Sequence, residues 1–139
     1  MRLVLDTDVV VAALRSPTGA SAELLRRARR GRVRLLASVP LFIEYEAKCA
    51  EQSHLRASGL TVRERRQFLD ALAALVEPVV VHYLWRPQLR DPADEMVLEA
   101  AVNGRADALV SFNHRDFGDV PQRFGISLLR PSETVRSLS

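Results

Sequence analysis

The chain has 139 residues, of which 47% are hydrophobic and 27% charged, and its formal net charge is +3 at pH 7. This length and apolar content fit one domain with a substantial core and exclude a disordered tail. No apolar run approaches the roughly 18 residues that a membrane helix needs. Met1-Arg2-Leu3 does not begin a secretory signal, and the single cysteine, Cys49, cannot form an internal disulfide. We therefore expect one domain over residues 1–139, in the cytoplasm and without a membrane partner.

Short β-rich runs alternate with helical stretches along the chain. The expected strands are Leu3–Leu5, Val33–Leu36, Pro78–His82, Ala108–Ser111 and Ile126–Leu129. The expected helices lie near Val9–Leu14, Ala20–Arg30, Val39–His54, Val62–Val76, Ala93–Asn103 and Glu133–Leu138. Strands that are separated by helices imply right-handed crossovers and a mostly parallel sheet. The sequence therefore predicts a three-layer α/β/α sandwich.

Asp6 interrupts the first apolar run at the point where the expected strand ends, and Asp8 follows two residues later. Ligands of open parallel sheets bind at the carboxyl ends of the strands. A carboxylate that is buried there costs stability unless a cation pairs with it. Asp6 is therefore the first candidate for a metal ligand.

Three further places carry acids that this architecture would bring toward Asp6. Glu44 lies near the second turn of a helix that Ser38 and Pro40 start. The other two places are the helix start Asp91-Pro92-Ala93-Asp94 and the segment Asn113–Asp116 after the strand Ala108–Ser111. Each has a structural alternative: helix capping for the aspartates of the helix start, an exposed helix face for Glu44, and an ordinary loop for Asp116.

Oxygen ligands of this kind suit hard cations such as Mg²⁺ or Mn²⁺. A metal in such a site lowers the pKa of a water, orients it for attack on phosphorus and stabilises the leaving oxygen. The residues by themselves indicate metal-dependent phosphoryl transfer.

The chain resembles the PIN-domain family, and in particular VapC-like toxins of toxin–antitoxin systems. The resemblance covers essentially the whole chain and rests on Asp6-Thr7-Asp8, Ser38–Tyr45, Arg90–Ala101 and Ala106–Asn113. It implies an endoribonuclease that uses Mg²⁺ or Mn²⁺, a cognate antitoxin as partner and a homodimer. Asn113 stands where many family members have Asp, so Asp116 is the alternative fourth ligand.

The resemblance also assigns roles to residues. The expected catalytic and metal-binding residues are Asp6, Glu44, Asp94 and Asp116. The residues expected to support these ligands are Thr7, Asp8, Asp91, Ser111 and Asn113. From their charge and position rather than from the resemblance, the residues expected to contact RNA are Arg26, Arg30, His114 and Arg115; for the arginine-rich run around Arg26 and Arg30, a solvated face is the alternative.

Two other functions fit parts of the sequence. A phosphatase of the haloacid dehalogenase type would use Asp6 as nucleophile and Asp8 as general acid, but Val9-Val10 and the lone Lys48 do not suit its motifs. A PIN-like scaffold without a metal site would bind RNA or protein without cleaving it, and Asn113 keeps this alternative open. We expect Trp85 to be an interface or core residue rather than a platform for bases.

Overall fold

The computed structural model describes residues 1–82 and 87–138, so Trp85 lies outside the described residues. Within them, one sheet contains the strands β1 (Arg2–Leu5), β2 (Arg34–Ala37), β3 (Val76–Pro78), β4 (Ala108–Val110) and β5 (Ser127–Leu129). The longer helices are α1 (Thr7–Arg15), α2 (Ala20–Arg29), α3 (Val39–Cys49), α5 (Val62–Leu75) and α6 (Pro92–Asn103). The shorter helices are α4 (Gln52–Ser58), α7 (His114–Phe117), α8 (Val120–Arg123) and α9 (Pro131–Ser137).

All strand pairs of the sheet are parallel, in the order β3-β2-β1-β4-β5. The chain moves from β1 outward to β2 and β3, then crosses back to β4 on the other side of β1. This reversal leaves the carboxyl ends of β1 and β4 as neighbours at a switch point, which is where ligands bind in open α/β sheets. Asp6 follows β1 at this point, and Ser111 follows β4.

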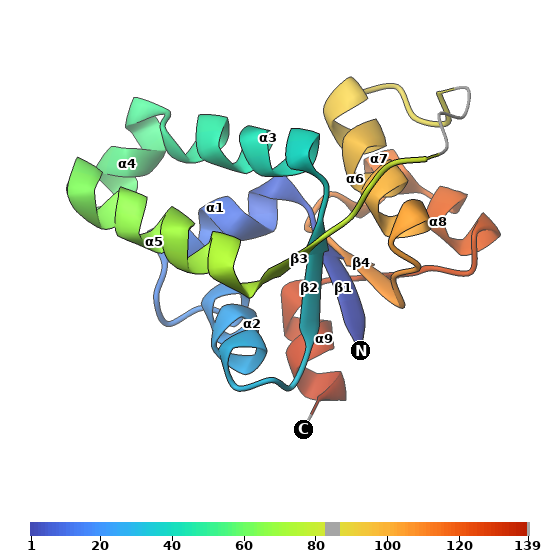
Figure 1. Cartoon of the computed structure of the whole chain (residues 1–139), viewed down its shortest axis with the longest axis horizontal. Helices are drawn as coiled ribbons and strands as arrows, with labels where there is room; N and C mark the ends of the chain where they lie inside the picture. The colour runs from blue at the N-terminus through green and yellow to red at the C-terminus, as the bar shows by residue number, and fades with distance from the viewer. Residues whose placement is uncertain (83–86, 139) are drawn as a thin grey trace.

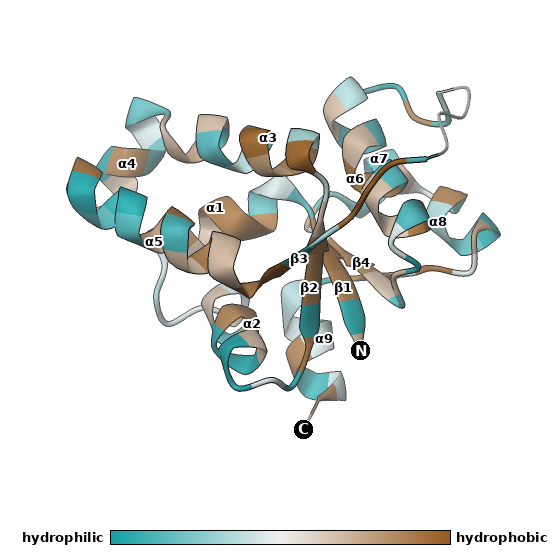
Figure 2. Cartoon of the chain, in the orientation of Figure 1, coloured by the Kyte–Doolittle hydropathy of each residue, from teal (hydrophilic) through white to brown (hydrophobic). Residues whose placement is uncertain are grey.

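Helices cover both faces of the sheet (Figure 1). Helix α2 packs against α1 and α9 on one face, and α6 packs on the other face against β1, β2 and β4. The strands are brown along most of their length, whereas the amino ends of β1 and β2 are teal (Figure 2). The three-layer α/β/α sandwich and its parallel sheet, predicted from the sequence, are confirmed.

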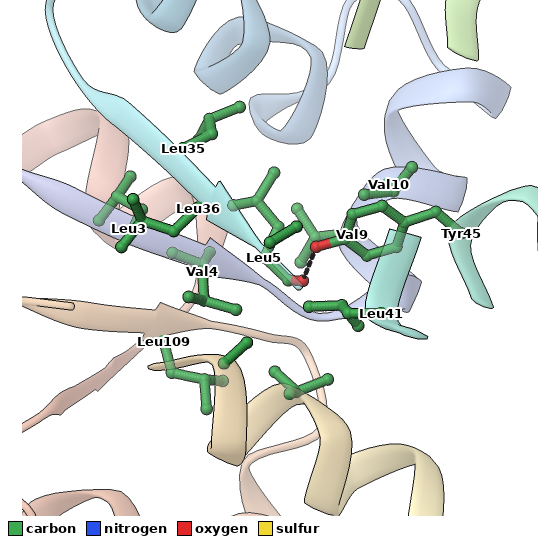
Figure 3. Close-up of a cluster of buried hydrophobic side chains, with 14 of the residues drawn as sticks. Leu3, Val4, Leu5, Val9, Val10, Leu35, Leu36, Leu41, Tyr45 and Leu109 are labelled. Carbon is green, nitrogen blue, oxygen red and sulfur yellow. Dashed lines mark hydrogen bonds between the residues drawn. The ribbon is translucent and has the colours of Figure 1, made fainter. Parts of the chain in front are cut away.

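The core lies on both sides of β1, where Leu3 and Val4 are fully buried. Figure 3 shows Tyr45 of α3 reaching the end of this strand, where its hydroxyl donates a 2.5 Å hydrogen bond to the carbonyl of Leu5. Because Leu5 directly precedes Asp6, this bond ties α3 to the strand end that carries the first acid.

The structure differs from the expected elements in three places. The third strand begins at Val76 and ends at Pro78, because Val76 leaves the helix with extended backbone and pairs with Leu35. The helix expected over Val39–His54 is two helices, since Glu51 is extended and starts α4. The short helices α7 and α8 were not expected. In the part of the chain that the structure describes, no helix has the length and apolar character to cross a bilayer.

The contact between Tyr45 and Leu5 predicts a stability effect. Tyr45→Phe keeps the packed ring but leaves a buried carbonyl without this donor, so we expect the free energy of unfolding to fall by about 1–3 kcal/mol. Urea unfolding followed by circular dichroism measures it. Unchanged stability would show that the carbonyl needs no donor from α3.

Candidate functional site

Asp6 joins the two turns that follow β1 and β4. One carboxylate oxygen accepts a 2.8 Å hydrogen bond from the Thr7 N–H, which caps α1. The other accepts a 2.6 Å bond from the hydroxyl of Ser111. The Asp6 N–H donates to the carbonyl of Val110 at 2.8 Å, which continues the pairing of β1 with β4. Asp6 is only 7% exposed, so its position is fixed from both strands.

Asp8 forms a second link between the same turns. Its Oδ2 accepts a 3.2 Å hydrogen bond from the Phe112 N–H. Its Oδ1 is buried and has no hydrogen-bond partner within residues 1–82 and 87–138. A buried carboxylate oxygen without a partner is costly, which makes it a candidate to receive a cation or a water. Asp8 thus lies within the cluster rather than beside it.

Helix α6 brings Asp94 to the cluster from the other face of the sheet. Asp91 is its N-cap and accepts a 2.9 Å bond from the Ala93 N–H, as the sequence predicts. Asp94, in the first turn, is only 6% exposed. Glu95 turns the other way and accepts bonds from the N–H groups of Gln88 and Leu89, at 2.9 Å for Leu89. The capping interpretation of Asp91 is correct for its hydrogen bonding, but its charge also acts on the cluster.

The fourth acidic place is organised by Asn113. Its N–H donates to the Ser111 hydroxyl at 2.8 Å, and its side-chain amide donates to Asp116 at 3.0 Å. The Asn113 amide therefore holds the Asp116 carboxylate, and the charge of Asp116 acts on Asp94. Asn113 and Asp116 work as a pair at this position.

The cluster disfavours the charged forms of three carboxylates, those of Asp6, Asp8 and Asp94. Burial raises the pKa of Asp6, against the hydrogen bonds from Ser111 and Thr7 that lower it. Burial and then the charge of Asp6 raise the pKa of Asp8 to about 7. Burial, followed by the charges of Asp6, Asp91 and Asp116, raises the pKa of Asp94 to about 6. These carboxylates repel one another and are short of compensating positive charge.

A cleft of about 420 Å³ opens on the cluster and is lined by Asp91, Asp94 and Asp116. Arg90 and Arg115 also line it, so the cleft contains both acids and cations. Arg115 therefore shares this cleft with Asp94 and Asp116, and its contact with RNA stays a prediction. His114 follows Asn113 and has a buried ring nitrogen, Nε2, for which the described residues provide no partner.

The donor chemistry of the cluster fits a hard divalent cation. All donors are oxygens, one of them is buried without a partner, and the raised pKa values show a need for positive charge. Over residues 1–82 and 87–138, no three His, Cys, Asp or Glu side chains are grouped so that, as they stand, they could hold a metal ion. A cation here would therefore keep several waters, as Mg²⁺ usually does.

For three expected site residues, the described part of the chain shows no hydrogen bond or ion pair to Asp6, Asp8 or Asp94. Glu44 is half-buried on α3, and its charge acts on Lys48 rather than being a main cause of the raised pKa values. Arg26 pairs with Glu23 at 2.7 Å within α2. Arg30 caps the end of α2 just before β2 begins, so it lies toward the amino ends of the strands. A role of Arg26 and Arg30 in RNA binding remains a prediction.

Two residues that position the site were not predicted from the sequence. Tyr45 holds the end of β1, and Glu95 holds the segment before α6. The sequence contains a weak signal for each, because a tyrosine follows Glu44 on the helix and a second acid follows Asp94.

The raised pKa values predict a pH dependence of stability. An acid whose pKa is higher in the folded state binds protons more tightly there, so stability falls as pH rises toward the folded pKa. In a chelating buffer, the melting temperature should therefore fall by a few degrees between pH 5.5 and pH 8, the window of Asp94 and Asp8. Differential scanning calorimetry measures this. Asp8→Asn should flatten the dependence, whereas Asp70→Asn, at an exposed position on α5, should leave it unchanged. A melting temperature that rises over this window would contradict the assignment.

Comparisons with known proteins agree with this architecture. The PIN domain family matches residues 2–115 of the chain. The fold is similar to a chain in the crystal structure of VapBC2 from Rickettsia felis bound to a DNA fragment from their promoter, with a TM-score of 0.60 and 15% identity. This match covers 94% of the present chain and 98% of the other. In sequence, no curated protein matches. The match over residues 2–115 is more than half of the chain, and the protein belongs to the PIN domain family.

Proposed function

We propose that the protein is a metal-dependent endoribonuclease and the toxin of a type II toxin–antitoxin system. The observation that carries the proposal is the convergence of Asp6, Asp8 and Asp94 at the switch point, with raised pKa values and an unpartnered oxygen. Family membership supports a nuclease over the haloacid dehalogenase alternative. The structural similarity to a chain of a VapBC complex supports an antitoxin as partner.

In this proposal, Asp6 and Asp94 hold Mg²⁺ or Mn²⁺, and Glu44 and Asp116 complete the set directly or through water. A bound metal would supply a Lewis acid and lower the pKa of the attacking water. The chain itself contributes orientation. Ser111 and the Thr7 N–H fix both oxygens of Asp6, and Asn113 fixes Asp116. Arg90 and Arg115 in the cleft attract the RNA backbone, which the acids alone would repel.

In this proposal the protein cleaves RNA in the cytoplasm. It is a homodimer, and binding of the antitoxin inhibits it. The buried thiol of Cys49 suits a reducing compartment. The scaffold alternative predicts RNA binding without metal binding. Measurements of RNA cleavage and of Mn²⁺ binding distinguish it from the nuclease.

Asp6→Asn and Asp94→Asn are expected to lower RNA cleavage by at least about a hundredfold, because each removes a charged group from the catalytic cluster. Cleavage of total RNA in the presence of Mn²⁺ measures the effect. Both variants should melt no lower than the wild type in chelator, since each removes a repelling charge. Asp70→Asn is the matched control and should cleave normally. Full cleavage by both site variants would refute the assignment.

Titration calorimetry with Mn²⁺ tests the metal site without any nuclease assay. We expect saturable binding by the wild type, and loss of that binding in Asp94→Asn. Absence of binding by the wild type would favour the scaffold.

A further inference from the structure

A second cleft, of about 570 Å³, is lined at one place by Asp8 of the acidic cluster. Its volume is within the ~300–1,000 Å³ typical of ligand sites. It is lined by residues of α1 and by residues at the end of α3 and the start of α4, both of which lie along α1 (Figure 1). Thr7, Asp8 and Phe112 belong to this cleft and also to the turns after β1 and β4. Because these residues are shared, the cleft adjoins the proposed catalytic site.

Phe112 is one of the exposed large hydrophobic residues, with 48% of it exposed, and it lies beside the site. Its backbone N–H is held by Asp8, so the residue that carries the ring is fixed although the ring faces solvent. Val11 and Ala12 of α1 add apolar wall to the same cleft. A fixed, exposed aromatic ring next to an apolar wall suits the flat face of a nucleobase, which stacks on aromatic side chains.

The cleft also contains cations. Arg15 in the last turn of α1 and Lys48 in the last turn of α3 both line it. Lys48 is the only lysine of the chain. Asp8 lies at the acidic end of the cleft, whereas Arg15 and Lys48 contribute positive charge. These two cations suit the RNA phosphate next to the one that is cleaved.

We propose that this cleft binds the nucleotide of single-stranded RNA that adjoins the cleaved phosphodiester bond. The base stacks on Phe112, and the next phosphate lies at Lys48 and Arg15. This inference rests on the proposed function, because it extends the path of the RNA from the acidic cluster.

Glu51 provides a test of the proposed phosphate contact in the opposite direction. It is paired with Lys48 at 3.2 Å and with His54 at 3.4 Å, and it lines the same cleft. A carboxylate at this place competes with a phosphate for Lys48. Removing its charge should therefore strengthen RNA binding, whereas removing the lysine should weaken it.

The base contact is tested with a short, fluorescently labelled single-stranded RNA of random sequence, in EDTA so that it stays intact. Phe112→Leu should raise the Kd from fluorescence anisotropy by about tenfold, since stacking contributes ~1–3 kcal/mol per base. Phe112→Trp should restore binding. A ribose–phosphate oligomer without bases should bind the wild type and Phe112→Leu equally. Val62→Ala, which also alters an exposed hydrophobic residue but outside the cleft, is the control.

The phosphate contact is tested by salt dependence. Lys48→Gln should reduce the slope of log K against log salt by about 0.7, the value for one phosphate contact on a single strand. Lys48→Arg should retain the slope, and Glu51→Gln should lower the Kd. Arg136→Gln, at an exposed position on α9, should change neither quantity.

The outcomes separate this inference from the proposed function. If the wild type cleaves RNA with Mn²⁺ but Phe112→Leu and Lys48→Gln bind like the wild type, this inference alone is wrong. If the wild type does not cleave RNA but its binding depends on Phe112 and Lys48, the cleft assignment stands and the nuclease proposal is wrong. RNA binding too weak to measure in the wild type overturns the inference.

Discussion

The hydrogen bond between Ser111 and Asp6 joins the two turns on which the site depends. It connects the ends of β1 and β4, which are adjacent because the order of strands reverses at β1. The same serine oxygen accepts the N–H of Asn113, and the other oxygen of Asp6 caps α1. One carboxylate therefore sets the start of a helix and the path of the loop after β4. The placement of Asp8, Phe112 and Asp116 follows from these turns.

The carboxylates gathered at this point oppose folding, and the surrounding structure has to hold them in place. Burial is the main cause of the raised pKa of Asp6, Asp8 and Asp94, so the folded chain disfavours the charged forms of these side chains. The contacts that keep them together are those of the scaffold: Tyr45 on the end of β1, and Glu95 on the segment before α6. Local electrostatic strain of this kind is expected at functional sites. It also explains why a cation is the simplest source of stabilisation here.

The sequence predicted those parts of the molecule that depend on local pattern. The apolar runs before Asp6 and around Leu109 gave two of the central strands, and Asp91-Pro92 gave the start of α6. The break at Glu51 was missed because neither Gly nor Pro marks it, and β3 was misplaced because Val76 suits both a helix end and a strand. Sequence could name Asp6 and Asp94 as candidates. It could not show that Asp8 accepts the Phe112 N–H and feels the charge of Asp6, because that depends on how the turns after β1 and β4 meet.

The fold, rather than the density of arginines along the sequence, decides which basic residues lie near the acidic cluster. The densest run of arginines, which includes Arg26 and Arg34, is matched in part by acids: Glu23 pairs with Arg26 and Arg27, and Glu77 pairs with Arg34. Those pairs are exposed or half-exposed, so they screen charge without adding much stability. The cations beside the acidic cluster come instead from scattered positions, Arg90 and Arg115 in one cleft and Arg15 and Lys48 in the other. In the proposed function, an RNA strand that crosses the acids would meet positive charge in both clefts, which a count of arginines along the sequence does not show.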